Sequence, residues 1–293
     1  MIPDRTQQKG SNQPILTVAL PVYNGVETLV TAIRSLLNQS FRDFELIILD
    51  DNSQDESVGI VRSFKDCRIK VVEGDQNIGL SARLNMAVDM ANGKYFARMD
   101  QDDIAFPDRF LKQVNYLEMH CEVDLLGSSV LVFSGDGVVN GVLPVKLSHD
   151  GICERPWNGF HLPHPTWMGR IGWFRMNKYD SCADGAEDQQ LLYRTYQTSC
   201  FACIKEPLLA YREARSFKKM FKARRILITT FVKVAYRRNE FGIIAKVLLV
   251  QSIKVVADVL NQIFKILVAR NVLLPPEQGC ISEWRKLWDK REG

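Results

Sequence analysis

The stretch FELIILDDNS, residues 44–53, decides the fold class of this chain. Its apolar part ends in Ile47-Ile48-Leu49, a continuous run that is typical of a strand buried on both faces of a parallel sheet. The polar turn Asp50-Asp51-Asn52-Ser53 follows without a break. From residue 14 to about residue 134 the chain repeats this arrangement, with short β-branched runs alternating with longer helical segments. The pattern predicts an α/β domain with a doubly wound, mostly parallel sheet.

The expected strands place four polar turns at one edge of this sheet. We expect strands over residues 15–20, 44–49, 68–72, 94–99 and 124–133, the last either as a fifth strand or as part of a hairpin with residues 138–145. The turns at the strand ends cover residues 21–25, 50–53, 74–77 and 100–103. Ligands bind at the carboxyl ends of the strands in such sheets, so the turns are expected to converge on one crevice. The pairs Asn24 with Glu27 and Ser53 with Glu56 have the spacing of capping boxes for the helices that follow.

The acidic turn Asp100-Gln101-Asp102-Asp103 is the main candidate for a metal site. It closes the apolar run Tyr95–Met99 and precedes a helix that is expected to start near Pro107. Carboxylates crowded at the end of a strand repel one another unless a cation lies between them. Mg²⁺ or Mn²⁺ carrying a phosphorylated ligand suits such hard oxygen donors. The alternative is a solvated loop in which an Asp caps the next helix.

Composition limits the other classes of function. Of the 293 residues, 46% are hydrophobic and 25% are charged, which is ordinary for one large globular domain with an appendage. Residues 1–13 are polar and lack the apolar core of a secretory signal, so we expect a cytoplasmic protein. The seven scattered cysteines suit reduced thiols. The sequence has no G-x-G-x-x-G after the first strand and no G-x-x-x-x-G-K-[ST], which disfavours an ordinary dinucleotide fold and a P-loop.

The C-terminal part of the chain is basic, whereas the rest is acidic. Residues 216–270 contain 12 Lys and Arg against 2 Asp and Glu, a local net charge of +10, and the remainder carries a net charge of −6. We expect one domain over residues 14–212 and a basic, amphipathic helical tail over residues 213–293. No apolar run in the tail reaches the roughly 18 residues expected of a membrane-spanning helix.

The tail has a wide apolar face and a narrow basic stripe, and Lys246, Lys254 and Asp258 interrupt its apolar runs. Such a helix fits an anionic membrane surface, on which it would lie flat. The alternative is that the helices pack on the first domain or on a second subunit. No nucleic acid is expected as a partner, because aliphatic residues dilute the basic ones and stacking aromatics do not alternate with them.

Taken in order, the polar turns resemble those of the inverting family 2 glycosyltransferases, whose GT-A fold is a nucleotide-binding α/β domain. The matching segments are Leu20–Gly25, Ser35–Phe41, Asp50–Ser53, Asn77–Leu80 with Arg83 and Asn85, Asp100–Asp103 with Pro107 and Arg109, His164–Thr166, and Glu187-Asp188. Their combination and order make the resemblance specific. It covers roughly residues 14–212.

The resemblance implies roles for the crevice residues. Asp51 would recognise uracil through a base N–H, unless it caps the following helix. Pro21 and Tyr23 would pack against the base and the ribose. Arg83 would meet a phosphate or Asp100, unless it is an exposed surface residue. With Asp100, these residues form the expected nucleotide-binding set: Pro21, Tyr23, Asp51, Arg83 and Asp100.

The resemblance also implies the metal ligands and the catalytic base. Asp100 and Asp102 would hold the ribose and the Mn²⁺ or Mg²⁺ ion that bridges both phosphates. Asp188 would take the proton from the attacking hydroxyl, unless Glu187 and Asp188 are only the acidic start of a helix. The role of His164 stays open between the acceptor cleft, the metal and the structure. The Q-x-x-R-W motif of processive members is absent after Asp188, which favours transfer of a single sugar.

We therefore expect a metal-dependent, inverting glycosyltransferase. It would move one sugar from a nucleotide donor, a UDP-hexose or UDP-N-acetylhexosamine, to a hydroxyl of a lipid-linked or polysaccharide acceptor. The setting implied by the resemblance is bacterial surface-polysaccharide assembly, with the protein peripheral at the inner face of the cell membrane. The alternative is a non-catalytic nucleotide-sugar-binding subunit that tethers a partner enzyme there. Asp188 distinguishes the two, because a binding module does not need a base.

Overall fold

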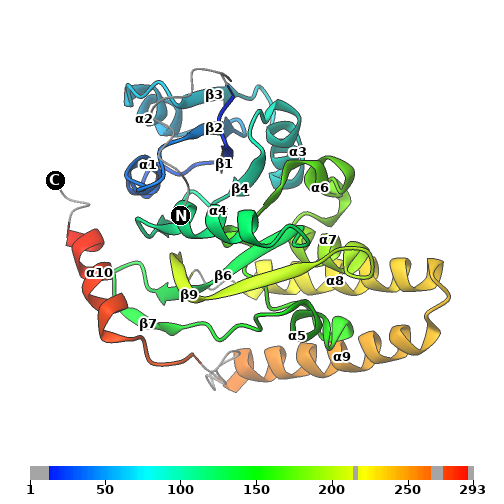
Figure 1. The fold of residues 1–293 in the computed structure, drawn as a ribbon. Helices are drawn as coiled ribbons and strands as arrows, with labels where there is room; N and C mark the ends of the chain where they lie inside the picture. The colour runs from blue at the N-terminus through cyan, green and yellow to red at the C-terminus, as the bar shows by residue number, and fades with distance from the viewer. Residues whose placement is uncertain (1–12, 214–216, 265–272, 290–293) are drawn as a thin grey trace.

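The computed structural model describes residues 13–213, 217–264 and 273–289. Its centre is a nine-stranded sheet with the order β3-β2-β1-β4-β8-β6-β9-β5, and β7 pairs with β6 beside this path (Figure 1). In chain order the strands are β1 (Leu16–Val22), β2 (Phe44–Asp50), β3 (Ile69–Glu73), β4 (Tyr95–Arg98), β5 (Ile104–Ala105), β6 (Leu125–Phe133), β7 (Val139–Val142), β8 (Met168–Arg170) and β9 (Phe201–Arg212). The predicted α/β class with a mostly parallel sheet is confirmed.

The parallel half of the sheet brings the polar turns together. β1 lies between β2 and β4 and pairs with both in parallel, with Val22 opposite Asp50 and Ala19 opposite Arg98. β3 continues the sheet beyond β2, with Glu73 opposite Asp50. The carboxyl ends of these four strands therefore open on the same edge, where a ligand crevice is expected.

Two strands lie where the sequence has no clear periodicity. β8 runs antiparallel between β4 and β6, and β9 runs parallel to β6. The sequence does not predict β9, because its buried ends are separated by the more exposed segment Ile204–Pro207, where the register with β6 also shifts. Proline cannot donate a hydrogen bond to the ladder, so it reads as a break in a strand.

Helices cover both faces of the sheet. The α-helices are α1 (Leu29–Leu37), α2 (Ser57–Ser63), α3 (Leu80–Met90), α4 (Arg109–Met119), α5 (His149–Cys153), α6 (Ile171–Met176), α7 (Glu187–Thr195), α8 (Phe217–Arg237), α9 (Phe241–Phe264) and α10 (Gln278–Asp289). The short 3₁₀ helices are η1 (Pro156–Asn158), η2 (His164–Thr166) and η3 (Ser181–Ala183).

The two predicted capping boxes are wrong. α1 and α2 begin later than the boxes require, and neither has a side-chain cap at its N-terminus. The side chain of Asn24 instead accepts a hydrogen bond from the backbone N–H of Gln54 at 2.8 Å. The hydroxyl of Ser53 accepts one from the N–H of Asn24 at 3.0 Å. These residues therefore join two crevice turns to each other.

The sheet separates two hydrophobic cores. Along β1 the side chains alternate, so that Val18 and Leu20 enter the core beneath α1 and α4, whereas Ala19 enters the core beneath α3. The second core also contains Trp167 and Trp173, both buried. The tryptophans of residues 146–212 therefore belong largely to the core.

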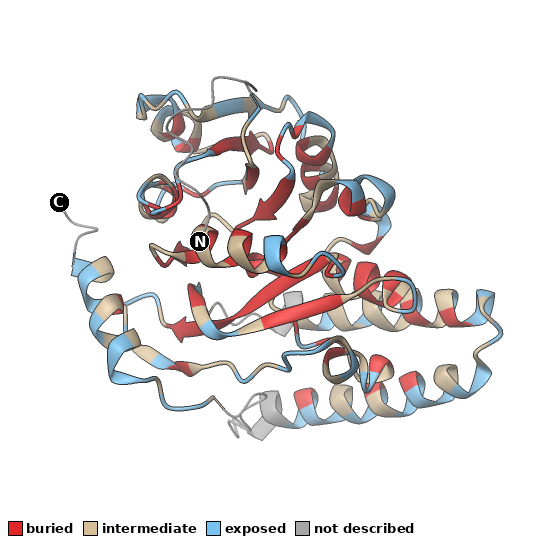
Figure 2. Cartoon of the chain, in the orientation of Figure 1, coloured by how far each residue is buried: buried red, intermediate tan, exposed pale blue. Residues whose placement is uncertain are grey.

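The C-terminal helices pack on the first domain, which is one of the two alternatives that the sequence leaves open for them. In α8 the buried Phe231 stacks on Tyr193 of α7, with ring centroids 4.1 Å apart. α9 runs alongside α8 and contacts η1. Both helices have exposed positions along their length (Figure 2). Among the described helices none is both long enough and apolar enough to cross a membrane. Whether residues 213–293 form a separate unit stays a prediction.

Candidate active site

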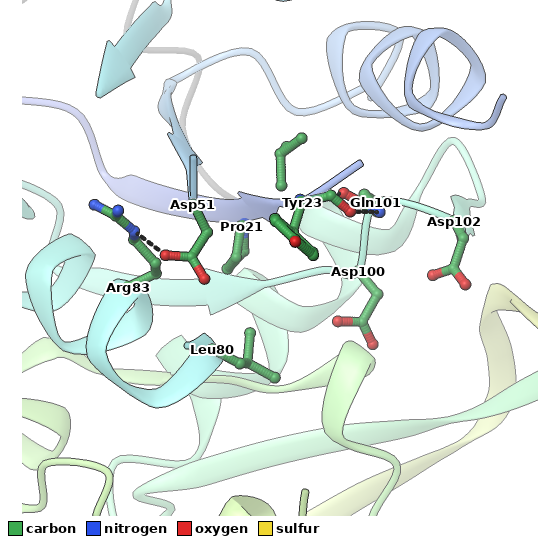
Figure 3. A pocket seen from close by; sticks show the side chains of 9 residues that line it. Pro21, Tyr23, Asp51, Leu80, Arg83, Asp100, Gln101 and Asp102 are labelled. Atoms are coloured by element: carbon green, nitrogen blue, oxygen red, sulfur yellow. Dashed lines mark hydrogen bonds and ion pairs between the residues drawn. The ribbon is translucent and has the colours of Figure 1, made fainter. Parts of the chain in front are cut away.

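A pocket opens at the carboxyl ends of β1, β2 and β4. Its lining consists of Pro21, Val22, Tyr23, Asp51, Leu80, Arg83, Asp100, Gln101 and Asp102 (Figure 3). Asp51 and Arg83 lie on one side of it, Asp100 on the other, and Pro21 and Tyr23 between them. The structure thus brings together every residue that the sequence predicts for nucleotide and metal binding. Asp188 is not among the lining residues, and the individual roles stay predictions.

Asp51 is the centre of a buried hydrogen-bond cluster. Its carboxylate accepts from the backbone N–H of Ile78 at 2.9 Å, from that of Gly79 at 3.0 Å and from Nε of Arg83 at 2.8 Å. A carboxylate has about four acceptor sites, so one site remains for a further donor such as a base N–H. Asp51 does not cap the helix that follows it, because two of its partners lie in the segment that leads into α3 and the third, Arg83, lies in α3 itself.

Arg83 is neither an exposed surface residue nor a partner of Asp100, the two environments within the protein that the sequence suggests for it. It is 3% exposed, so it is not a surface residue, and its carboxylate partner is Asp51 rather than Asp100. Its Nη2 also donates to the carbonyl of Gln76 at 2.8 Å. Arg83 therefore holds the turn before α3 against the end of β2. Its place in the pocket lining still allows contact with a bound anion.

The partner of Asp100 is Arg98, which is wholly buried at the end of β4. Both terminal nitrogens of its guanidinium donate to the Asp100 carboxylate, Nη1 to Oδ2 at 3.0 Å and Nη2 to Oδ1. Burial alone would lower the pKa of Arg98, but the charge of Asp100 and its hydrogen bonds raise it. Arg109 in turn donates to the carbonyl of Arg98 at 2.8 Å. The buried guanidinium of Arg98 thus fixes the orientation of the Asp100 carboxylate.

The three carboxylates of the acidic turn are not equivalent. Asp103 is buried and accepts a hydrogen bond from the backbone N–H of Arg212 at 3.0 Å, so it anchors the end of β9. Asp102 lines the pocket, and its pKa is raised by burial and by the nearby charge of Asp100. A cation between Asp100 and Asp102 would relieve this repulsion.

The residues present fit a divalent cation that is shared with a bound phosphate. Within the described part of the chain, no group of three His, Cys, Asp or Glu side chains is placed to hold a metal ion. Mg²⁺ and Mn²⁺ are nevertheless commonly bound through one or two carboxylates, with substrate phosphates and water completing the shell. Asp100 and Asp102 supply that number of carboxylates.

Glu187 and Asp188 at the start of α7 have different surroundings. Glu187 is buried, lies 3.5 Å from Nδ1 of His164 and accepts from the backbone N–H of Gly185 at 2.7 Å. Burial would raise its pKa, but the hydrogen bond and charge of His164 outweigh this and lower the pKa to about 2. For Asp188 the side-chain partner is Gln189, at 3.1 Å. Burial, with Glu187 beside it, raises the pKa of Asp188 although His164 opposes the shift. Asp188 is therefore the better placed of the two to accept a proton.

Tyr179 lies next to the pair formed by His164 and Glu187. The hydroxyl of Tyr179 lies 3.0 Å from Nε2 of His164. Burial raises the pKa of Tyr179, and the charges of Glu187, Asp188 and Asp100 add to the rise against the opposing charge of Arg98. The charges of Asp188 and Asp100 therefore act on the same buried tyrosine.

Helix α3 is joined to the segment before α7 by side-chain bonds. Asn85 donates to the carbonyl of Tyr179 and accepts from its N–H, both at 2.9 Å. Asp184 accepts from the N–H of Ser81 at 3.0 Å. Helix α3, which contributes Arg83 to the pocket, is therefore hydrogen-bonded to the segment that precedes Asp188.

The sequence-based prediction misses Arg98, Gln101 and Tyr179. Arg98 carried a signal, since residues two apart in an extended chain share a face, so an Arg in an apolar strand could have been paired with Asp100. Gln101 forms a ring with the backbone of Tyr23, accepting at 2.8 Å and donating at 3.0 Å. Nothing in the sequence indicates this contact or the place of Tyr179.

Several known proteins are similar to this chain. Residues 17–176 match the family model described as glycosyl transferase family 2. The chain is 35% identical to EpsE of Bacillus subtilis (strain 168) over 168 residues, 56% of this chain and 59% of that protein. It is 26% identical to the Escherichia coli protein WfgD over 140 residues, 48% of this chain and 55% of that protein. The match spans a little over half the length of each relative.

Comparison with solved structures extends the similarity to the fold. The crystal structure of S. aureus TarS residues 1–349 in complex with UDP-GlcNAc superposes with a TM-score of 0.61 at 16% identity, covering 93% of this chain and 79% of that one. At this identity the likeness concerns the fold alone, which is the predicted GT-A architecture. The family match covers more than half of the chain, and it includes the strands and turns that form the pocket. The chain belongs to the family 2 glycosyltransferases.

Proposed function

We propose that this glycosyltransferase moves a single sugar, with inversion, from a UDP-hexose or UDP-N-acetylhexosamine to a hydroxyl of a lipid-linked or polysaccharide acceptor. The observation that carries the proposal is the convergence of Asp51, Arg83, Asp100 and Asp102 on one pocket. The name of WfgD supports both substrates, because it describes a transfer from UDP-Glc to α-D-GlcNAc-diphosphoundecaprenol. The UDP-GlcNAc complex of TarS supports the class of donor.

The donor would bind with its base near Asp51 and its diphosphate near Asp100. The free acceptor site of Asp51 suits an N–H of uracil, and Pro21 and Tyr23 offer the base and ribose a surface on which to pack. Arg83 contributes positive charge on the same side of the pocket. Arg98 keeps the carboxylate of Asp100 in a fixed orientation, so little reorganisation is needed when the donor arrives.

A bound Mn²⁺ or Mg²⁺ ion would supply positive charge to the diphosphate leaving group. Asp100 and Asp102 would hold it, because their oxygens are hard ligands and their mutual repulsion favours a cation between them. The metal dependence makes a direct test possible. UDP should raise the melting temperature more with Mn²⁺ than without it, since a ligand that binds the folded state more tightly stabilises it more. An equal rise after addition of EDTA would contradict metal-bridged binding.

Asp188 is the group we assign as general base. An inverting displacement needs a base on the side opposite the leaving group. Its raised pKa makes Asp188 the stronger base of the pair, whereas Glu187 is engaged by His164 and Gly185. His164 would position these carboxylates rather than contact the sugar.

The decisive experiment is a donor panel. Purified protein with Mn²⁺ is incubated with UDP-glucose, UDP-galactose and their N-acetylhexosamine counterparts, and slow hydrolysis of each donor is measured without an acceptor. We expect hydrolysis of one donor above the others, and its loss on Asp100→Asn. Binding of UDP without hydrolysis or transfer of any donor would instead support the alternative of a non-catalytic binding subunit.

We also propose that the reaction takes place at the inner face of the cell membrane, with the protein bound to an anionic lipid surface. The lipid-linked acceptor in the name of WfgD and the basic C-terminal segment of this chain support this location. Vesicle binding that increases with anionic lipid and decreases with salt would be the expected behaviour.

A further inference from the structure

Helix α9 has its polarity reversed relative to an ordinary surface helix. Gln251 and Asp258 are buried, with exposures of 1% and 8%. The exposed side chains are largely aliphatic, from 37% at Val259 to 64% at Leu249, and include Leu248, Ile253, Val256 and Leu260. A helix that packs only on its own domain is expected to show the opposite arrangement. We call these six aliphatic side chains the outward face of α9.

Specific bonds fix the orientation of the helix. Asp258 forms an ion pair with Arg224 of α8 at 2.7 Å, and the same guanidinium donates to Gln251 at 2.8 Å. Gln251 also donates to the carbonyl of Trp157 in η1 at 3.2 Å. Rotating α9 to bury its aliphatic side would break this buried ion pair and leave a charge without its partner. The outward face is therefore held outward.

The lysines of α9 do not form the outward basic stripe that the sequence predicts. Lys254 donates to the carbonyl of Asn158 at 2.9 Å, and the ammonium of Lys246 lies 4.3 Å from the ring centre of Trp157. Both therefore point toward η1. Among the side chains described between residues 241 and 260, Lys246 is the only exposed charge.

The neighbouring helix α8 supplies positive charge instead. Its exposed side chains include Lys222, Arg225, Lys233 and Arg237, and its sequence contains no acidic residue. A basic helix beside a row of exposed aliphatic side chains complements an anionic lipid headgroup layer over an acyl region. Pairing of two copies through the same hairpin would bring two such basic helices toward each other, which like-charge repulsion disfavours.

We propose that the outward face of α9 inserts into the interfacial region of an anionic lipid leaflet, with the basic side chains of α8 against the headgroups. This inference rests on the proposed function only in naming the same membrane. It assigns the contact with the acyl region to the aliphatic side chains of α9. It assigns the electrostatic attraction to the headgroups to α8 instead of α9. The pocket would then be held at a fixed distance from the leaflet, as a lipid-linked acceptor requires.

The test is sedimentation of the full chain with vesicles of phosphatidylglycerol and phosphatidylethanolamine, and with phosphatidylcholine alone. The variant Leu249→Asp with Ile253→Asp places two charges on the outward face, and we expect its vesicle affinity to fall on the order of tenfold or more. The variant Leu249→Gln with Ile253→Gln should show a smaller loss in the same direction. The matched control is Met119→Asp with Met176→Asp, two exposed methionines on α4 and α6, for which no change is expected.

A second arm isolates the basic helix. Lys222→Gln with Lys233→Gln should weaken binding to the anionic vesicles and leave binding to phosphatidylcholine unchanged. Unchanged sedimentation of both Leu249/Ile253 variants would overturn the proposal. So would a wild-type dimer, detected by light scattering, that these variants convert to a monomer, because a second copy would then cover the face. Donor hydrolysis without vesicles tests the proposed function separately.

Discussion

The hydroxyl of Tyr179 lies 3.0 Å from Nε2 of His164, on the side of the imidazole opposite Glu187. The His therefore links a carboxylate of α7 to a tyrosine that senses the charge of Asp100. The charge of His164 also opposes the rise in the pKa of Asp188, the residue next to Glu187.

The first prediction concerns the pH dependence of transfer. Asp188 accepts a proton only when ionised, so the rate should fall as pH drops through its raised pKa. His164 opposes that rise, so His164→Asn should raise the pKa of Asp188 further and move the acid limb of kcat/KM to higher pH. A limb that stays in place, measured across about pH 4–8 with UDP binding intact, would contradict the positioning role.

The second prediction separates the two carboxylates at the start of α7. Asp188→Asn should reduce transfer by about 10²–10⁴-fold with near-normal UDP binding, the range for loss of a general base. Glu187→Gln should mainly reduce stability, because a pKa lowered to about 2 means that its ionised form stabilises the fold. That stability is present above the ordinary pKa near 4.5 and is lost as pH falls toward 2. The melting-temperature difference from wild type should therefore be largest near neutral pH and shrink in acid. Equal transfer by Asp188→Asn and wild type would assign the base elsewhere.

The third prediction compares two aspartates of the acidic turn. Asp100→Asn should destabilise the fold by about 1–3 kcal/mol, because the wholly buried Arg98 would lose its charged partner. Asp102→Asn should leave stability within about 0.5 kcal/mol of wild type, since its raised pKa shows that the ionised form is disfavoured in the fold. Both variants should lose the Mn²⁺-dependent part of UDP stabilisation. Urea unfolding with and without UDP measures both effects, and equal stability of the two variants would argue against the role of Arg98.

The fourth prediction concerns Gly79. Its φ of +89° and ψ of 165° suit glycine, and a Cβ here would lie 2.0 Å from Oδ2 of Asp184. Gly79→Ala should cost about 1–3 kcal/mol and weaken UDP binding, because its N–H is one of the donors to Asp51. The control is Gly172→Ala in α6, where a Cβ meets nothing within 4 Å. That variant should gain up to about 1 kcal/mol.

The fifth prediction tests whether the C-terminal helices are part of the core. Phe231→Ala should cost about 3–5 kcal/mol, because the ring is fully buried against Tyr193. Phe241→Ala removes a ring that is 60% exposed at the start of α9 and should cost less than about 1 kcal/mol. Similar small losses for both variants in chemical denaturation would mean that α8 can detach without unfolding the domain.

The sequence predicts the parallel strands well because strands that are buried on both faces consist mostly of apolar residues. The apolar runs of β1, β2 and β4 are continuous, and each ends in a polar turn. Asp51, Asp100 and Asp102 follow from their positions after those strands. The positions after the strands therefore identify the residues of the pocket, although they do not give the contacts between them.

What the sequence does not predict depends on contacts between distant segments. The sequence suggests a phosphate or Asp100 as the partner of Arg83, whereas the fold pairs Arg83 with the carboxylate of Asp51. Lys246 and Lys254 contact η1 because Trp157 and Asn158, nearly 100 residues earlier, lie next to α9. Helical periodicity gives the relative positions of side chains around α9, and it does not give the side that meets the domain.

The pair of hydrogen bonds between Asn85 and Tyr179 has a practical consequence for redesign. Replacing residues 177–186 with those of a relative would break both hydrogen bonds unless the graft also brought a matching α3. The two segments form one exchangeable module, and chimeras should be cut outside both of them.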